Sequence, residues 1–338
     1  MYKVSICVPV YGVESFIEQC VTSLFEQTYD NLEYIFVNDC TQDNSIDIIQ
    51  KTLANYPTRI KQVTIVNHLK NKGLGISRNT AVSKASGRFI LHVDSDDFLD
   101  KTAVEMLVNT QINTNADIVV LDEIRYRRHY REIRYHKDYK SSQEMLVSFL
   151  QKDDSVSIWG KLILSTLYKE NNICVEQNVN MSEDFQVTPR LLFYASKIAN
   201  VHGVYYNYNC LNSNSYTASF SIDKIKQVWR TLEVLNCFFK DKGDIYTRAL
   251  LKGKSKILID QFKSSARSYS NKKFHKEIKR KIETIDSDLI KECDCFTKVA
   301  LKINNYFCLH LYVIIFSYLK RNIKLIFQLF KNIKKRAY

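Results

Sequence analysis

The chain has 338 residues, of which 45% are hydrophobic and 12% aromatic, with only 8 glycines and 3 prolines. This composition excludes a disordered, collagen-like or linker-dominated chain and predicts a folded protein with one large or two modest cores. The 49 lysines and arginines exceed the 36 acids by 13, and residues 301–338 contain eight of these cations and no acid.

The cysteines argue against a secreted protein. They are nine in number and dispersed, and no apolar signal-peptide core precedes the charged Glu14. A disulfide scaffold is therefore not expected, and a reducing cytosol fits better.

Four apolar, β-rich runs alternate with helical patterns in the first hundred residues. The expected strands are Val4–Val10, Glu33–Val37, Val63–Val66 and Arg88–Val93. The expected helices, in which apolar residues recur at helical spacing, are Glu14–Glu26, Ser45–Leu53 and Leu74–Ser86. Apolar strands joined by crossover helices predict an α/β fold with a mostly parallel sheet, whose ligands bind beyond the carboxyl ends of the strands.

The rest of the chain divides into two further regions. A strand at Asp117–Leu121 precedes mixed helix and strand, and from Ile222 onward the pattern is nearly all helical. We therefore predict an α/β domain over residues 1–221, a helical region over 222–300 and a basic tail over 301–338.

A basic, tyrosine-rich stretch runs from Arg125 to Lys140. Its tyrosines roughly alternate with charged residues, as they do in a half-exposed strand pair, so a solvated hairpin is expected. No zinc finger, RNP signature or helix-turn-helix accompanies it, and we expect no nucleic-acid partner. An anionic acceptor stays open as a ligand of this stretch.

Three aspartates, Asp94, Asp96 and Asp97, follow the fourth expected strand. Ionised acids so close together repel one another, and a hard Mg²⁺ or Mn²⁺ would relieve the repulsion and also hold a diphosphate. The alternative is a turn followed by a helix N-cap, with no ligand.

Other polar residues end neighbouring strands at the same edge. Tyr11 follows the first strand and Asp39 the second, while Asn71, Gly73 and Arg78 lie where a helix begins, a place that favours an anion. Neither G-x-G-x-x-G nor G-x-x-x-x-G-K-[ST] occurs, which disfavours an NAD oxidoreductase and a P-loop NTPase.

These motifs resemble those of the family 2 glycosyltransferases, which are inverting nucleotide-sugar enzymes with the GT-A fold. The resemblance is specific over residues 3–100 and continues weakly to residue 208. It implies a GT-A sheet followed by a helical C-terminal region. It also implies a hexosyltransferase that moves a sugar from a nucleotide diphosphate donor, UDP-linked, to a hydroxyl of a cell-surface glycan or lipid-linked acceptor, with a divalent metal, Mg or Mn.

The resemblance also implies a role for each matching residue. The donor-binding residues would be Pro9, Tyr11, Asp39, Asn71, Gly73, Arg78 and Asp94. Asp96 would bind the metal, and Asp97 would share that role. The family pattern after the second strand is two acids and then Gly-Ser, whereas this chain has Asn38-Asp39-Cys40-Thr41, so the first acid is missing.

The implied general base is Asp184 or its neighbour Glu183, with Asp184 preferred. A sugar hydroxyl is a poor nucleophile, and a single displacement needs a carboxylate that takes its proton. The alternative is that these acids only stabilise the dipole of a helix over Phe185–Ala195. Trp159 would stack on an acceptor sugar, with core packing as its alternative.

The tail after residue 300 carries a lysine stripe opposite apolar residues when projected on a helix. This pattern predicts an interfacial helix that binds anionic lipid headgroups, which would place the protein peripherally on the inner face of the cell membrane. An amphipathic helix packed on the protein is the alternative.

Two other functions stay open on the same fold. A sugar-nucleotidyltransferase would carry a glycine-rich phosphate loop after the first strand, and Val10-Tyr-Gly-Val-Glu14 is not one. A noncatalytic sugar- or lipid-binding protein would be expected to have lost Asp96 or Asp184, and both are present.

Overall fold

The computed structural model describes residues 2–212, 221–266, 272–284, 295–303, 306–315 and 318. By its internal contacts the chain forms two compact units, Met1–Ala249 and Leu250–Tyr338. Each unit is described by itself.

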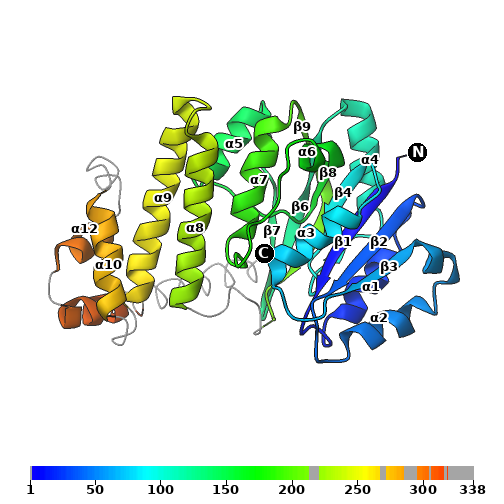
Figure 1. The fold of residues 1–338 in the computed structure, drawn as a ribbon, viewed down its shortest axis with the longest axis horizontal. Coiled ribbons are helices and arrows are strands. Elements are labelled where there is room, and N and C mark those ends of the chain that lie inside the picture. Colours follow the sequence, from blue (N-terminus) through cyan, green and yellow to red (C-terminus); the bar gives the residue numbers. More distant parts are fainter. Residues whose placement is uncertain are drawn as a thin grey trace, which may run out of the picture. The chain divides into compact units, whose positions relative to one another are not determined.

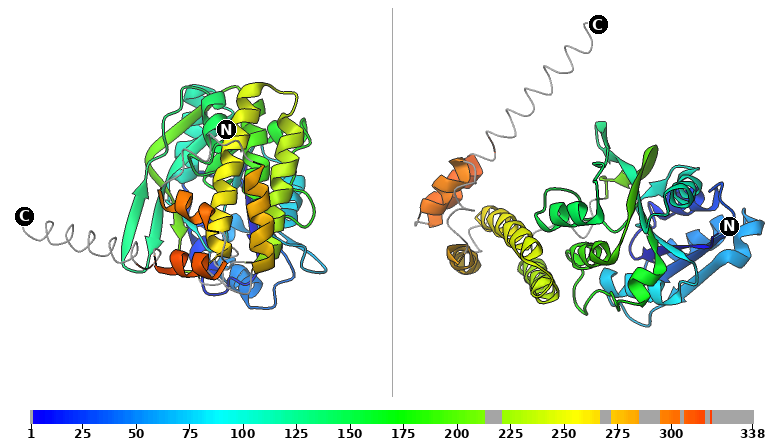
Figure 2. Two further views of the ribbon diagram at one scale, coloured as in Figure 1. Left: turned by 90° about the vertical axis from the view of Figure 1, so that its left-hand side faces the viewer. Right: turned by 90° about the horizontal axis from the view of Figure 1, so that it is seen from above.

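The first unit is built on a sheet that contains nine strands within the described residues, in the order β3-β2-β1-β4-β8-β6-β9-β5 with β7 paired to β6 (Figure 1). The strands are β1 Val4–Val10, β2 Leu32–Asn38, β3 Val63–Asn67, β4 Phe89–His92, β5 Phe98–Leu99, β6 Ile118–Arg127, β7 Tyr130–Arg134, β8 Lys161–Leu164 and β9 Ile198–Asn209. Helices lie on both sides of this sheet (Figure 2). The expected α/β fold is confirmed.

The helices of the first unit include the three expected in the first hundred residues. They are α1 Ile17–Phe25, α2 Ser45–Leu53, α3 Leu74–Lys84, α4 Ala103–Thr114, α5 Ser142–Leu150, α6 Ser165–Lys169, α7 Glu183–Tyr194 and α8 Ile222–Phe239, with a 3₁₀ turn at Pro57–Gln62. The first three strands and β4 pair in parallel, as predicted. β8 is antiparallel to both of its neighbours, β4 and β6, so the strand direction reverses at β8 and the sheet is mixed.

The basic stretch forms the expected hairpin. β6 and β7 pair antiparallel from Glu123 opposite Arg134 to Arg127 opposite Tyr130. β7 pairs with no other described strand, and most of its side chains are exposed. The solvated hairpin is therefore confirmed.

The second unit contains most of α9 Asp244–Ser265, followed by α10 Lys272–Glu283, α12 Cys295–Lys302 and a helical segment at 306–315. A buried contact joins α9 to α10, where Ser265 Oγ lies 2.8 Å from His275 Nδ1. Tyr306 then donates a hydrogen bond of 3.0 Å to the Ser265 carbonyl. Among the helices described, none is both long and apolar enough to cross a membrane. The predicted lysine stripe, Lys320 to Lys335, lies outside the described residues.

One carboxylate ties together the starts of the central strands. Glu33 in β2 accepts hydrogen bonds from Ser5 of β1 and from Ser86 and Gly87, which precede β4, and it pairs with Lys3 at 2.7 Å. Burial alone would raise the pKa of Glu33, but the hydrogen bonds outweigh burial and lower the pKa to about 2. The ionised form of Glu33 is therefore the one that stabilises the sheet.

This pKa predicts how the stability of the fold depends on pH. The folded-state pKa of about 2 lies below the ordinary value of 4.5, so the contribution of Glu33 is complete above pH 4.5 and is lost as the pH falls toward 2. In Glu33→Gln we expect lower stability at pH 7 and a smaller loss between pH 5 and pH 3. Denaturant unfolding at each pH measures both, and Glu170→Gln, an exposed acid, should keep the wild-type pH dependence. Equal pH dependence in Glu33→Gln and wild type would contradict this account.

Candidate active site

The acidic segment after β4 is a turn that is fixed to β9. The Asp97 amide donates to the Asp94 carbonyl at 3.0 Å, which closes the turn. Asp97 is buried, and its two oxygens accept hydrogen bonds of 2.7 Å from the Tyr206 hydroxyl and the Asn209 amide. The Tyr206 hydroxyl in turn accepts from the Asp94 amide at 3.0 Å. Asp97 therefore holds the turn, and its oxygens are already engaged.

Asp96 is the acid of this turn that fits a metal ion. Burial, and then the charge of Asp94, raises the pKa of Asp96, and a divalent cation would oppose both effects. One of its oxygens accepts from Asn212 at 2.9 Å. The described residues bring together no group of three or more His, Cys, Asp or Glu side chains that could hold an ion by themselves. Mg²⁺ commonly takes only one or two carboxylates and completes its coordination shell with substrate phosphates and water. A single carboxylate such as that of Asp96 is therefore a sufficient protein ligand.

A buried arginine joins this turn to the predicted base. Arg78 of α3 donates to Asp94 Oδ1 at 2.7 Å, and its guanidinium nitrogens lie 3.6 Å from Glu183 Oε1 and 3.8 Å from Asp184 Oδ1. Burial would lower the pKa of Arg78, but Asp94, Asp184 and Glu183 together raise it. One cation thus faces three carboxylates that are up to 90 positions apart in the sequence.

The two acids of the predicted base differ in accessibility. Asp184 has 21% of its side chain exposed, whereas Glu183 is buried. Burial raises the pKa of both, and the charge of Arg78 opposes the rise. Because a general base must reach its substrate, the geometry favours Asp184 of the pair.

A small cavity of about 10 Å³, lined in part by Arg78, His92, Tyr168 and Asp184, adjoins this network. That volume is about what one water molecule needs. Two guanidinium nitrogens of Arg78 and the His92 Nδ1 atom have no hydrogen-bond partner among the described residues. The His92 ring is buried and is bonded through Nε2 alone, 3.0 Å from the Tyr168 hydroxyl.

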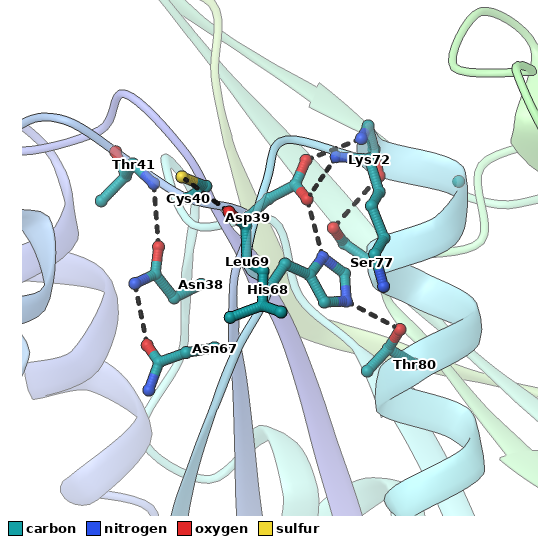
Figure 3. A network of polar contacts seen from close by, with 12 residues as sticks. Asn38, Asp39, Cys40, Thr41, Asn67, His68, Leu69, Lys72, Ser77 and Thr80 are labelled. Carbon is teal, nitrogen blue, oxygen red and sulfur yellow. Dashed lines mark hydrogen bonds and ion pairs between the residues drawn. The ribbon is translucent and has the colours of Figure 1, made fainter.

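Asp39, expected to bind the nucleotide base, makes a buried network at the end of β2 (Figure 3). Its Oδ1 accepts from His68 Nδ1 at 2.7 Å and from the Lys72 amide at 2.8 Å, and its Oδ2 accepts from the Gly73 amide at 2.7 Å. Asp39 is only 3% exposed. The carboxylate therefore fixes the loop before α3 against the strand ends, and a base would have to share or displace these donors.

Two residues missed in the sequence shape this loop. His68 follows β3 directly, at the strand-end position that drew attention to Asp39. Asn180 contacts the start of α3, where its Oδ1 accepts a hydrogen bond from the Gly75 amide at 3.2 Å. A Cβ atom on residue 73 would clash with the Asn180 side chain. Gly73 also has a φ of +88°, so the position requires glycine for two reasons. No local pattern could have connected residue 180 to residue 73.

The remaining predicted residues lie at the same strand ends or nearby. Tyr11 is 54% exposed, Asn71 is exposed and Pro9 is buried within β1. Trp159 is 7% exposed, and its ring stacks on Tyr206 with a centroid distance of 4.3 Å and on Tyr208 at 5.3 Å. The indole therefore offers little free surface, and its stacking on an acceptor sugar stays a prediction.

We expect Asp39→Asn to destabilise the fold. The amide group replaces a carboxylate oxygen that faces backbone N–H donors, and loss of such buried bonds costs about 2 kcal/mol. The melting temperature should fall by about 4–8 °C. Asp241→Asn, an exposed acid, is the control and should leave it unchanged. A melting temperature of Asp39→Asn equal to that of the control would mean that the network around Asp39 contributes nothing to stability.

Comparison with known proteins finds relatives of this chain in sequence and in fold. Glycosyltransferase GlyA of Streptococcus pneumoniae is 27% identical over 244 residues, which are 67% of this chain but 32% of GlyA, so the chain spans about a third of that relative's length. The crystal structure of Staphylococcus aureus TarS 1–349 in complex with UDP-GlcNAc superposes with a TM-score of 0.70 at 16% identity, over 95% of this chain and 92% of that chain. Mannosyltransferase PcManGT from Pyrobaculum calidifontis in complex with GDP-Man and Mn²⁺ gives a TM-score of 0.54 at 14% identity, over 93% and 85%.

At these identities the two solved structures support the fold alone. The family is given by a sequence model, Glycosyl transferase family 2, which matches residues 5–173 and so covers half of the chain. The matched residues contain β1 to β4, Arg78 and the acidic turn. The chain belongs to glycosyl transferase family 2.

Proposed function

We propose that this chain transfers a hexosyl group from a UDP-sugar to a hydroxyl of a glycan or lipid-linked acceptor, with inversion and with a divalent metal. The ion network of Arg78 is the observation that carries this proposal. The same Arg78 guanidinium contacts Asp94, at the edge where a donor would bind, and Asp184, the more exposed of the two acids of the predicted base. Donor binding and proton removal can therefore occur side by side.

The donor would lie across the carboxyl ends of β1, β2 and β4. Tyr11 and Pro9 would border the base. Asp39 would accept a hydrogen bond from the base, in the place of or beside those that its carboxylate already accepts. The positive end of the α3 dipole, next to Asn71 and Gly73, and the charge of Arg78 favour a diphosphate, while the Lys72 and Gly73 amides themselves are engaged by Asp39. UDP is our choice of nucleotide because the solved relative of higher TM-score holds UDP-GlcNAc, whereas PcManGT holds GDP-Man.

The residues of the acidic turn would have different tasks. We assign the metal to Asp96; Asp97 is buried and each of its oxygens already accepts one hydrogen bond, so it could share the metal only through its remaining lone pairs. A bound Mg²⁺ or Mn²⁺ would neutralise the charge that develops on the departing diphosphate. Asp94 would orient the donor sugar. The charge of Arg78 would reduce the repulsion between Asp94 and Asp96.

Asp184 would act as the general base. Its ionised form is stabilised by Arg78, and an acceptor hydroxyl would approach through the fifth of the side chain that is exposed, since Oδ1 itself is buried. It would take the proton of that hydroxyl as the oxygen attacks the anomeric carbon from the side opposite the diphosphate. A single displacement of this kind inverts the anomeric configuration.

The wider organisation is also a proposal. We assign catalysis to residues 1–221, a supporting role to the helical region 222–300, and contact with an anionic membrane surface to the tail 301–338. The protein would then act at the cytoplasmic face of the cell membrane on an acceptor presented there.

We expect Asp96→Asn to abolish metal-dependent donor binding without harming the fold. Removal of one carboxylate relieves repulsion in the metal-free turn, so the melting temperature without ligand should not fall. In a thermal-shift titration with UDP, the wild type should gain more stability with Mn²⁺ than with EDTA, and the variant should not. An undiminished Mn²⁺-dependent shift in the variant would move the metal ligand to Asp94 or Asp97.

We expect Asp184→Asn to keep UDP and metal affinity but to lose turnover by a factor of about 10² or more. Sugar transfer is measured by UDP release in the presence of an acceptor, with a panel of UDP-sugars. Asp223→Asn removes an exposed acid from the first turn of α8 and controls for a helix-dipole effect. Turnover of Asp184→Asn equal to that of the control would leave Asp184 a helix-stabilising acid, and parallel loss of UDP affinity would place it in the donor pocket.

A further inference from the structure

One face of the β6–β7 hairpin carries an ordered row of charges. Residues opposite each other in the pairing share a face, which groups Glu123 with Arg134, Arg125 with Glu132 and Arg127 with Tyr130. We call these six residues the arginine face. It contains three arginines and two glutamates.

Ion pairs hold the arginine face in place. Arg125 Nε lies 2.7 Å from Glu123, while Arg127 and Arg134 lie 3.3 and 3.0 Å from Glu132. Arg127 and Arg134 keep 37% and 45% of their side chains exposed. Their guanidinium groups are thus oriented by the pairs but still accessible to a ligand.

The arginine face continues into the candidate active site. In the parallel pairing of β6 with β9, Tyr206 lies opposite Glu123 and Tyr208 opposite Arg125. The Arg125 guanidinium lies 5.5 Å from the centroid of the Tyr208 ring, and Trp159 stacks on both tyrosines.

The inner end of this surface reaches both groups of acids. The Tyr206 hydroxyl binds Asp97, and a backbone hydrogen bond from Ile158, next to Trp159, reaches Asp184. A chain of contacting side chains therefore connects the acids of the site to Arg125; within it Tyr206 and Trp159 are buried, and the half-buried Tyr208 is the outermost ring.

Positive charge is in excess along the whole hairpin. Residues 125–140 contain seven lysines and arginines but only Glu132 and Asp138 as acids. Arg128 forms no ion pair with any residue that the structure describes, and it is exposed. Tyr130 and Tyr135 are also exposed and offer flat faces to sugar rings. Such a surface matches a glycan that bears negative charge and would gain little from a neutral one.

We propose that the acceptor is an anionic glycan chain that lies along the arginine face, with its terminal hydroxyl at Asp184. This inference rests on the proposed function and names its acceptor class. Phosphodiester and carboxylate groups share the required chemistry. A lipid surface fits less well, because the ordered arginines lead inward along the Trp159 stack to the reacting groups.

The test uses the full chain and three fluorescent probes: a ribitol-phosphate oligomer, a glucuronate-containing oligosaccharide and a neutral glucan oligomer. Anisotropy at 50 mM salt should give at least tenfold tighter binding to one of the anionic probes than to the neutral one. Arg127→Gln combined with Arg134→Gln should weaken that binding about fivefold, as expected for two exposed ion pairs. The difference should fade at 500 mM salt.

Two controls separate specific contact from net charge. Lys51→Gln with Lys61→Gln removes the same charge from exposed positions before β3, at the other end of the strands, and should change affinity less than twofold. Arg131→Gln alters the same hairpin on the face opposite Arg127 and should also have a smaller effect than Arg134→Gln alone. The two anionic probes distinguish phosphodiester from carboxylate recognition.

A UDP thermal shift, measured on every variant, keeps this inference separate from the proposed function. No UDP shift in the wild type would overturn the proposed function itself. An intact UDP shift with equal affinity for charged and neutral probes, or with unchanged affinity in the Arg127 and Arg134 double variant, would overturn the anionic acceptor. Reduced pelleting of the double variant with phosphatidylglycerol vesicles, with glycan binding unchanged, would instead make the hairpin a membrane contact and overturn the inference.

Discussion

The repulsion among carboxylates around a single buried arginine is the constraint that organises this site. Arg78 is the cation that the structure places among Asp94, Glu183 and Asp184, and its charge cannot balance three ionised acids. The buried Lys161 offsets part of the surplus by lowering the pKa of Asp184, and protons, a bound cation or dipoles of the protein must meet the rest. Burial and mutual repulsion accordingly raise the pKa values of Glu183 and Asp184. A change of charge on Asp94, or on one member of the Glu183–Asp184 pair, therefore alters the protonation of that pair.

The scaffold around the network divides stability and chemistry between the two ends of the sheet. At the start of the strands, Glu33 is fully bonded and holds β1, β2 and the entry to β4 together. At their carboxyl ends, the polar groups of Arg78, His92 and Asp184 retain unpartnered atoms. Unmet hydrogen-bonding capacity costs stability in a folded protein, and it gathers where a ligand is expected to supply the missing partners.

The sequence alone was enough to predict the regular elements of the first hundred residues and the edge of the sheet at which the candidate residues gather. Strands β1 to β4 and helices α1 to α3 follow from apolar periodicity, because each depends on neighbours within a few residues. His68, Asn180 and the pairing of Asp97 with Tyr206 could not be predicted in this way, since each contact joins segments that are about 30 to 110 residues apart. The reversal of strand direction at β8 was missed for the same reason: an antiparallel partner is chosen by the tertiary fold and leaves no mark on its own short apolar run.

The bonds of Asp39 have a thermodynamic consequence for the loop that they hold. The amides of Lys72 and Gly73 are fixed by a buried side chain before any nucleotide arrives. A flexible loop would lose about 1–2 kcal/mol of backbone entropy for each residue ordered by its ligand. Here that loss belongs to folding, so the affinity of a nucleotide that binds at this edge, as we propose, would reflect the contacts made and owe little to the ordering of this loop.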